Sequence, residues 1–270
     1  AYTVNWEKRL NEGSFVGLGQ YGTNAIKYSH DGASYIDAEG QDVWVDSYQM
    51  RSPALTVSGE YAAIYDIGGS QVNIYNSSGR TGTAEALLPV TKAAVSESGI
   101  LACVIEDNTA SYIVFFNRDG APIDITIKSL LSGDGFPTDI ALSPDGTQLI
   151  AAFEYMDGMQ FSSKVIFYDF SEIGKNIPNR LVGGFEAPFA SDFVARVRFI
   201  NSTYSYAVSD AGICFFSSKN LASPELIKEI PIEEEIMSVL NFKNHVALIL
   251  RANEGEEAYR LRIFKAGGEE

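Results

Sequence analysis

A short sequence pattern recurs along the chain at a nearly constant interval. In its first copy, "SYIDAEG" at 34–40, a bulky apolar residue is followed by Asp, and Gly stands four places after the apolar residue. "NIYNSSG" at 73–79 and "VFFNRDG" at 114–120 repeat it, and looser copies follow. The aligned apolar positions are 36, 75, 116, 168, 216 and 264, about 46 residues apart on average. A chain built this way is made of six similar units, each too small to fold alone.

The residue types in this pattern are those that reverse the direction of a strand. Asp and Asn side chains accept hydrogen bonds from the backbone that follows them, and Gly takes a positive φ without steric cost. The bulky residue before each turn would then be the last core contact of its strand. We therefore predict hairpin turns at 37–40, 76–79 and 117–120.

A second kind of turn precedes an apolar strand in every unit. These turns are "QYGTN" (20–24), "SGE" (58–60), "SESG" (96–99), "SPDG" (143–146), "NSTY" (201–204) and "FKNH" (242–245). The strands after them, such as "LACVI" and "VALIL", are continuously apolar, which is typical of strands buried on both faces. Repeats of this length with four strands each predict an all-β chain folded as a β-propeller with six four-stranded blades.

We place the blades in a single domain, 1–270, at about 15–48, 53–88, 93–128, 138–186, 194–232 and 236–265. The sixth blade would lack its outer strand. Residues 3–10, "TVNWEKRL", have strand character and would supply that strand and close the ring. Seven blades remain the alternative, if the interval from 138 to 194 hides an irregular unit or the native chain extends past Glu270. An open solenoid would need capping repeats, and none is recognised.

The chain is strongly acidic, with a net charge of −15. Such a surface repels phosphate backbones and anionic membranes, which argues against nucleic-acid binding. Cys103 and Cys214 lie in apolar strand patterns, so we expect buried free thiols. No apolar run reaches the roughly 18 residues of a membrane span, and no signal peptide is recognised. Because Ala1 is not an initiator methionine, we expect a trimmed ectodomain.

Several segments resemble known propeller repeats. "YIDAEGQDVW" at 35–44 resembles the quinoprotein-type repeat, in which an Ala/Asp-x-x-Gly turn is followed by a strand ending in Trp, and "LSPDGTQLIAAF" resembles the Ser-Pro-Asp-Gly turn of many propellers. With "SHDGASYIDAEG", "KVIFYDFSEIGKNIPNRLVGGF" and "PELIKEIPIEEEI", the chain from about Gly19 onward is similar to a cell-surface propeller family of unknown function in Firmicutes. The resemblance implies an extracellular protein with a membrane helix ahead of the propeller. It implies no catalytic residues and no quinone cofactor.

A set of acidic residues recurs where the second strand of a unit turns into the third. The set comprises Asp31, Asp66, Asp107, Asp157 and Asp210. Carboxylates gathered at one mouth of a channel would suit a hard cation such as calcium, which takes six to eight oxygen ligands. Asp66, Asp107, Asp157 and Asp210 are the metal-ligand candidates. The alternative is that Asp is simply a favoured turn residue, spread too widely around the rim to converge on one ion.

A second set of charged residues stands at the starts of the innermost strands. These ligand-binding candidates are Arg51, Lys92, Asp139, Arg196 and Glu235. They would face the channel at the same end as the acidic turns. Arg51 or Arg196 would clamp a ligand carboxylate with both arms of its guanidinium group. The alternative is that the set forms mutual ion pairs around a water-filled pore.

The sequence supports no catalytic residue. The only histidines, His30 and His245, are predicted at turns on opposite ends of their blades and cannot share a site. "GLGQYG" at 17–22 has the glycine spacing of a dinucleotide-binding loop but precedes a strand pattern and not a helix. We therefore expect no cofactor, with calcium as the one alternative.

These observations favour a non-enzymatic recognition scaffold over an enzyme. We expect an extracytoplasmic protein at the cell surface, with a protein or a cell-envelope component as its partner. The competing function is a calcium-dependent hydrolase or lyase that uses carboxylates at the channel mouth. A third hypothesis, a quinone-binding propeller, has only the single Trp-containing repeat in its favour.

Overall fold

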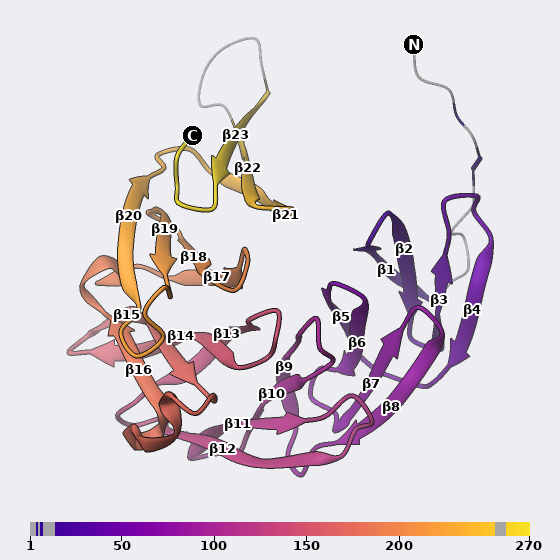
Figure 1. Cartoon of the computed structure of the whole chain (residues 1–270), viewed down its shortest axis with the longest axis horizontal. Coiled ribbons are helices and arrows are strands. Elements are labelled where there is room, and N and C mark those ends of the chain that lie inside the picture. The colour runs from indigo at the N-terminus through magenta and orange to yellow at the C-terminus, as the bar shows by residue number, and fades with distance from the viewer. Residues whose placement is uncertain (1–3, 5, 8–13, 252–257) are drawn as a thin grey trace. The chain divides into compact units, whose positions relative to one another are not determined.

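The computed structural model describes residue 4, residues 6–7, residues 14–251 and residues 258–270. The chain divides into two compact units, 1–128 and 129–270. Over the described residues the secondary structure is β-strands arranged in six antiparallel sheets, with three short 3-10 helices (Figure 1).

The first unit contains three sheets, each with its strands in chain order. The first sheet comprises β1 (Phe15–Tyr21), β2 (Asn24–Ser29), β3 (Gly32–Ile36) and β4 (Asp42–Ser47). The second comprises β5 (Pro53–Ser58), β6 (Tyr61–Asp66), β7 (Gln71–Asn76) and β8 (Gly79–Glu85). The third comprises β9 (Val90–Val95), β10 (Leu101–Glu106), β11 (Ala110–Phe116) and β12 (Pro122–Leu130), whose last two residues belong to the second unit.

The second unit contains the other three sheets. The fourth comprises β13 (Phe136–Leu142), β14 (Gln148–Asp157), β15 (Gln160–Asp169) and β16 (Leu181–Phe185). The 3-10 helices η1 (Gly174–Asn176), η2 (Pro178–Arg180) and η3 (Ala187–Phe189) flank β16. The fifth comprises β17 (Val194–Phe199), β18 (Tyr204–Ser209), β19 (Gly212–Ser217) and β20 (Glu225–Pro231). The sixth comprises β21 (Ile236–Phe242), β22 (His245–Arg251) and β23 (Tyr259–Lys265).

The predicted fold class is confirmed, because these six antiparallel sheets are the blades of a β-propeller. Five sheets have four strands, and the sixth has three strands among the described residues, as the sequence predicted. The strand expected over 3–10 falls largely outside the described residues, so closure of a ring by that strand stays a prediction, as does a single domain over 1–270.

The predicted turn chemistry is confirmed in atomic detail. The Asp37 side chain accepts hydrogen bonds from the backbone N–H groups of Glu39 and Gln41, at 3.0 and 2.8 Å, and Gly40 has a φ of 79°. The Asn117 side chain bonds the N–H groups two and four residues later in the same way, at 3.0 Å each. These side chains replace the strand hydrogen bonds that are lost where the chain reverses.

The hydrophobic core lies between consecutive sheets within each unit. In the second to fifth sheets the two middle strands are largely buried, as in β10, where five of six residues are buried, and β19, where all six are. One continuous apolar cluster joins the second and third sheets, and others join the first to the second, the fourth to the fifth and the fifth to the sixth. Outer strands such as β4 alternate exposed and half-buried residues, because only one face meets a neighbour.

Both cysteines are free and buried, as predicted. Cys214 lies in the core between the fourth and fifth sheets. Loss of hydration raises the pKa of its thiol to about 12, and the charges of Glu229 and Asp192 add to this effect. The thiol is therefore protonated at neutral pH and behaves as a small apolar side chain.

The first and second sheets are joined by an aromatic stack that includes the one Trp-containing repeat. The Trp44 ring lies parallel to the Tyr75 ring, with 5.0 Å between ring centroids and 8° between planes. The Trp44 indole N–H donates to the backbone oxygen of Asn76 at 3.2 Å. Trp44 thus fastens β4 to the end of β7 in the next sheet.

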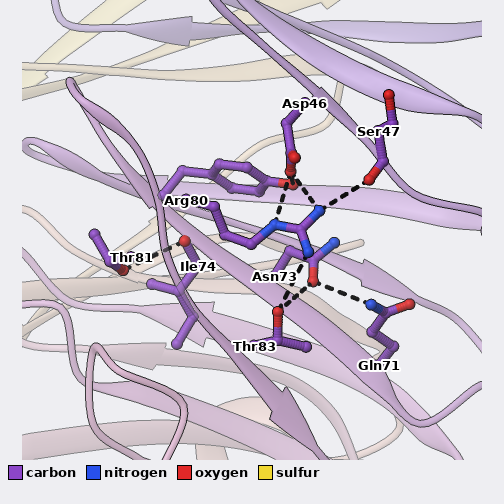
Figure 2. Close-up of polar contacts among 9 residues, drawn as sticks. Asp46, Ser47, Gln71, Asn73, Ile74, Arg80, Thr81 and Thr83 are labelled. Carbon is purple, nitrogen blue, oxygen red and sulfur yellow. Dashed lines mark hydrogen bonds and ion pairs between the residues drawn. The ribbon is translucent and has the colours of Figure 1, made fainter.

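A charged cluster stands beside this stack (Figure 2). Arg80 donates from Nε and Nη2 to one carboxylate oxygen of Asp46, at 2.8 and 2.5 Å, and Nη2 also donates to the Ser47 backbone oxygen at 3.0 Å. The Tyr75 hydroxyl donates to the same Asp46 oxygen at 2.7 Å. The Asp46 carboxylate therefore neutralises Arg80 and bridges β4 to β7 and β8.

Candidate functional site

Every innermost strand except β5 has a structural irregularity near its first residues, and β1 has it at Phe15–Gly17. In β9, β13, β17 and β21 the pairing with the next strand skips one residue, which forms a β-bulge. The skipped residues are Thr91, Thr138, Ala195 and Met237. A bulge changes the direction in which neighbouring side chains point. Two bulges, at Ala195 and Met237, stand on either side of the junction between the fifth and sixth sheets.

A pocket of about 430 Å³ opens at this junction, within the second unit. Its lining comes from β17, the end of β18 and the segment that enters β21. Phe193, Arg196, Asp210, Glu235, Met237 and Ser238 are among the residues that line it. The pocket thus unites three residues that the sequence analysis named in two separate sets, namely Arg196, Asp210 and Glu235.

Arg196 is held from the neighbouring sheet. Its Nη1 donates to the backbone oxygen of Val239 in β21, at 3.0 Å. Among the residues that the structure describes, no carboxylate forms an ion pair with Arg196. One arm of the guanidinium group is therefore fixed by the protein, while Nε and Nη2 have no partner in the described part of the chain.

The carboxylates that line the pocket each have a protein partner. Glu235 pairs with Arg251 at 2.9 Å. Glu234 pairs with Arg260, and the Glu234 side chain is less exposed than the Arg260 side chain. Asp210 accepts a hydrogen bond from the backbone N–H of Phe193 at 3.0 Å. Among the described residues of the pocket lining, Arg196 is therefore the cation without an oppositely charged partner, and Asp210 is the one carboxylate that has only a backbone partner.

Apolar side chains form much of the wall. Phe193 is 45% exposed and Met237 is 40% exposed, although both are large and apolar. Ile236 and Val239 pack partly into the core that joins the fifth and sixth sheets. Exposed apolar side chains around a polar group are typical of ligand pockets, because burial of the ligand's apolar surface supplies affinity and the polar group sets its orientation.

Asp192 adds negative charge just outside the pocket. Partial loss of hydration raises the pKa of its carboxyl group, and the neighbouring charge of Asp210 raises it further. Two carboxylates close together repel each other, so the less hydrated one gains its proton more easily. The rim beside Phe193 is therefore acidic, in contrast to the cationic side of the pocket at Arg196.

The other three ligand-binding candidates lie elsewhere. Arg51 is exposed in the connection between β4 and β5, and Lys92 lies half-buried in β9, so both belong to the first unit. Asp139 in β13 is 2% exposed. Its Oδ2 accepts hydrogen bonds from Arg198 Nη1 at 2.5 Å and from the Val197 N–H at 2.9 Å. Asp139 thus ties the fourth sheet to the fifth, and a ligand role for these three residues stays a prediction.

The four metal-ligand candidates all lie at the turns where the sequence placed them, and Asp66, Asp107 and Asp210 each accept a hydrogen bond from a backbone N–H. Asp66 Oδ1 accepts a hydrogen bond from the Ser52 N–H at 2.7 Å. Asp107 Oδ1 accepts from the N–H groups of Thr109 and Ala110, at 2.8 and 2.9 Å, and these bonds lower the pKa of its carboxyl group. Asp157 ends β14 and is exposed.

Across the described part of the chain, no three His, Cys, Asp or Glu side chains gather closely enough to hold a metal ion. A calcium site built from Asp66, Asp107, Asp157 and Asp210 stays a prediction. His30 lies at the turn between β2 and β3, and its Nδ1 is 3.1 Å from the Met50 backbone oxygen. His245 begins β22 and stacks on Phe242, with ring centroids 5.4 Å apart.

Sequence reasoning did not identify Phe193, Met237 or Ser238 as pocket residues. Each of these residues stands directly before a strand or near its start, in "DFVARV" and "IMSVL". An apolar residue at such a position, like Phe193 or Met237, is usually part of the hydrophobic core. The bulges at Ala195 and Met237 change this expectation. The sequence does contain one signal. At the equivalent bulges of β9 and β13 the skipped residue is a threonine, Thr91 or Thr138, whose hydroxyl group bonds to the next strand. Ala195 and Met237 replace that threonine and have no hydroxyl group.

Comparison with solved structures places this fold among β-propellers. Hsv2 from Kluyvelomyces marxianus matches with a TM-score of 0.57 at 13% identity, over 81% of this chain and 73% of that one. The Neurospora crassa Pan2 WD40 domain matches with a TM-score of 0.54 at 10% identity, over 86% and 70% of the two chains. The N-terminal domain of Nup159 matches with a TM-score of 0.54 at 12% identity, over 93% and 76%. Identities this low support the fold alone.

No curated protein matches the chain significantly. Among the described residues, none of the helices is long and apolar enough to cross a membrane. A protein-family comparison matches residues 1–270, the whole sequence. The chain therefore belongs to the family of unknown function DUF5711.

Proposed function

We propose that this β-propeller is a non-enzymatic recognition module whose ligand site is the pocket between the fifth and sixth sheets. The observation that carries the proposal is the pocket itself, in which an arginine fixed by a backbone carbonyl stands among half-exposed apolar side chains. Its volume of about 430 Å³ lies within the range of small-ligand pockets. The ligand is a protein segment or a component of the cell envelope.

The proposed location is the cell surface, outside the cytoplasm. The resemblance of the chain from Gly19 onward to a family of Firmicutes cell-surface propellers supports this location, and the same resemblance implies a membrane helix ahead of the propeller. Protease treatment of intact cells that express the native protein tests this. Cleavage of the propeller without lysis supports a surface location, whereas cleavage only after lysis contradicts it.

Methionine methyl groups provide a direct test of the ligand site. The chain has four methionines, of which Met237 lines the pocket, Met50 is buried, and Met156 and Met159 are exposed near the turn between β14 and β15. Protein labelled with ¹³C at the methionine methyl groups is titrated with short acidic, basic and apolar peptides and with peptidoglycan fragments. The Met237→Leu variant assigns the pocket signal.

The proposal predicts that at least one ligand class shifts the Met237 signal in a saturable manner while the Met50 and Met159 signals stay in place. Met159 is 97% exposed, so it serves as the control for nonspecific contact. Ligands that bind but shift only Met156 or Met159 would place the recognition site elsewhere. If no ligand class shifts Met237, the pocket is not a recognition site.

A further inference from the structure

The charges in the pocket between the fifth and sixth sheets identify the chemistry of its ligand, provided that this pocket is the recognition site proposed above. Glu234 and Glu235 are already paired with Arg260 and Arg251, and Asp210 already accepts the Phe193 N–H. Arg196 has no carboxylate partner among the described residues. Because a half-buried guanidinium group gains from an anionic partner, the group that completes this pocket is an anion.

The geometry of Arg196 favours a carboxylate. Its Nη1 is occupied by the Val239 backbone oxygen, which leaves the edge formed by Nε and Nη2. Arg80 uses that same pair of atoms to bind the Asp46 carboxylate in the first unit, at 2.8 and 2.5 Å. A planar carboxylate matches this edge with two parallel hydrogen bonds. Arg196 therefore presents the same donor edge as Arg80. The chain supplies a carboxylate to that edge of Arg80, whereas the described residues supply none to Arg196.

The walls and the overall charge narrow the ligand further. Phe193 and Met237 expose apolar surface into the pocket, so the group that bears the carboxylate is itself apolar. The Ser238 hydroxyl also lines the pocket and can bond to a peptide N–H or carbonyl. A net charge of −15 repels polyanions, but a single carboxylate at Arg196 is accommodated.

We propose that this pocket binds the C-terminal carboxylate of a peptide or protein whose last residue is apolar. The carboxylate occupies the Nε–Nη2 edge of Arg196, the last side chain packs against Phe193 and Met237, and the main chain passes Ser238 toward the acidic rim at Asp210. A basic or neutral ligand group would leave the Arg196 charge unmatched.

Matched peptides test this inference. Acetyl-Ala-Phe-Leu is prepared with a free C-terminal carboxylate and, separately, with a C-terminal amide, which differ only in the group that Arg196 would bind. Binding of each is measured by calorimetry, and the Met237 methyl signal reports whether the peptide enters the pocket. We expect the acid to bind at least tenfold more tightly than the amide and to shift Met237. Octanoate, a carboxylate on an apolar chain without peptide groups, forms a third arm.

The Arg196→Gln variant should bind the acid and the amide equally, at the affinity of the amide. Arg118→Gln is the matched control, because it removes an exposed arginine of the first unit that does not line the pocket, and it should keep the preference for the acid. An unchanged circular dichroism spectrum and urea unfolding curve confirm that each variant is folded.

Three results would overturn the inference: equal affinity for acid and amide, an acid preference that survives in Arg196→Gln, or octanoate binding as tightly as the peptide acid. Absence of peptide binding also overturns it. In that case the wider ligand titration decides the recognition function separately, because another ligand class that shifts Met237 would sustain the pocket as the recognition site.

Discussion

Two junctions between sheets use arginine in opposite ways. At the junction of the first and second sheets, Arg80 binds the Asp46 carboxylate, which also accepts a hydrogen bond from the Tyr75 hydroxyl, and the Tyr75 ring stacks on Trp44. At the junction of the fifth and sixth sheets, Arg196 bonds a backbone carbonyl, and the described residues supply it no carboxylate. The same architecture thus yields a completed structural contact in one place and an incomplete one in the other.

The junction of the fourth and fifth sheets shows that a completed contact is also available in the second unit. Arg198, two residues after Arg196 in the same strand, receives the buried carboxylate of Asp139. Removing one partner of such a pair leaves the other charge uncompensated and destabilises the protein, whereas removing an arginine that has no internal counter-charge does not. We therefore expect substitutions of these arginines and of their partners to lower the free energy of unfolding by different amounts.

The largest effect is expected for Asp139→Ala. Its loss removes the carboxylate that Arg198 and the Val197 N–H both use inside the junction. Because the Arg198 side chain is 37% exposed, the expected loss is about 3 kcal/mol, at the low end for breaking a buried pair. Urea unfolding measures the free energy, with Asp157→Ala, an exposed change in the same unit, as the control. Equal stability of the two variants would contradict the structural role of Asp139.

Trp44→Ala should cost about 3 kcal/mol, because it removes the stack on Tyr75 and leaves space between the first and second sheets. Trp44→Phe keeps most of the stacking but loses the hydrogen bond to the Asn76 backbone oxygen, so its cost should be about 1 kcal/mol. Unfolding followed by tryptophan fluorescence is unsuitable here, so circular dichroism is the measurement. Val43→Ala, beside it on an exposed face, should leave the free energy of unfolding nearly unchanged.

Buried tyrosines make the stability depend on alkaline pH. Burial raises the pKa of Tyr206 to about 12, whereas a tyrosine in an unfolded chain titrates near 10. The folded protein therefore keeps this proton where the unfolded chain loses it, so the contribution is complete below pH 10 and is lost as the pH rises to 12. The expected full fall is about 3 kcal/mol, because the pKa values of the folded and unfolded states differ by about two and each pKa unit corresponds to about 1.4 kcal/mol.

Tyr206→Phe tests that contribution, because phenylalanine cannot ionise. The variant loses the hydrogen bond to Asn241, at about 1 kcal/mol near neutral pH, but its free energy of unfolding should fall less steeply between pH 10 and 12. Urea titrations at pH 8, 10 and 11 measure the two slopes. The other buried tyrosines still contribute in both proteins, so only the difference between the slopes is diagnostic. Parallel slopes would mean that Tyr206 titrates normally.

The fold could be predicted from sequence because its signals are local. Asp37, Asn76 and Asn117 each bond the backbone within four residues, so the turn is encoded in a few adjacent letters. The spacing of those turns then fixes the number of sheets. The strand ends lie within a few residues of the predicted blade limits for the same reason.

The site could be predicted only in part, because its contacts are not local. Arg196, Asp210 and Glu235 each occupy a position of the repeat at which other units also have a charged residue, and this position alone identified them as candidates. An arginine can form an ion pair with a carboxylate more than fifty positions away in the sequence, as Arg198 does with Asp139. The residues next to the arginine do not reveal that pair. The bulge that brings Met237 into the pocket lining is likewise invisible in the letters around it. Local sequence fixes the strands, but pairing between sheets decides which charges are satisfied.

The smallest effect, and the sharpest comparison, is between Arg80→Gln and Arg196→Gln. Removing Arg80 leaves Asp46 without its counter-charge in a partly covered site, so the expected loss is about 1–2 kcal/mol. Removing Arg196 loses one hydrogen bond to a backbone oxygen, which glutamine can partly replace, so the expected change is about 0.5 kcal/mol or less. Urea unfolding under identical conditions gives both values.

The two substitutions are chemically identical, so a difference between them reports the surroundings of each arginine. A cost at Arg196 as large as that at Arg80 would mean that the chain itself completes the pocket, and a ligand carboxylate would then have no vacant donor edge to bind. A near-zero cost would mean that the guanidinium group is held in place without contributing to folding. A half-buried arginine retained at no benefit to stability is what the proposed carboxylate site predicts.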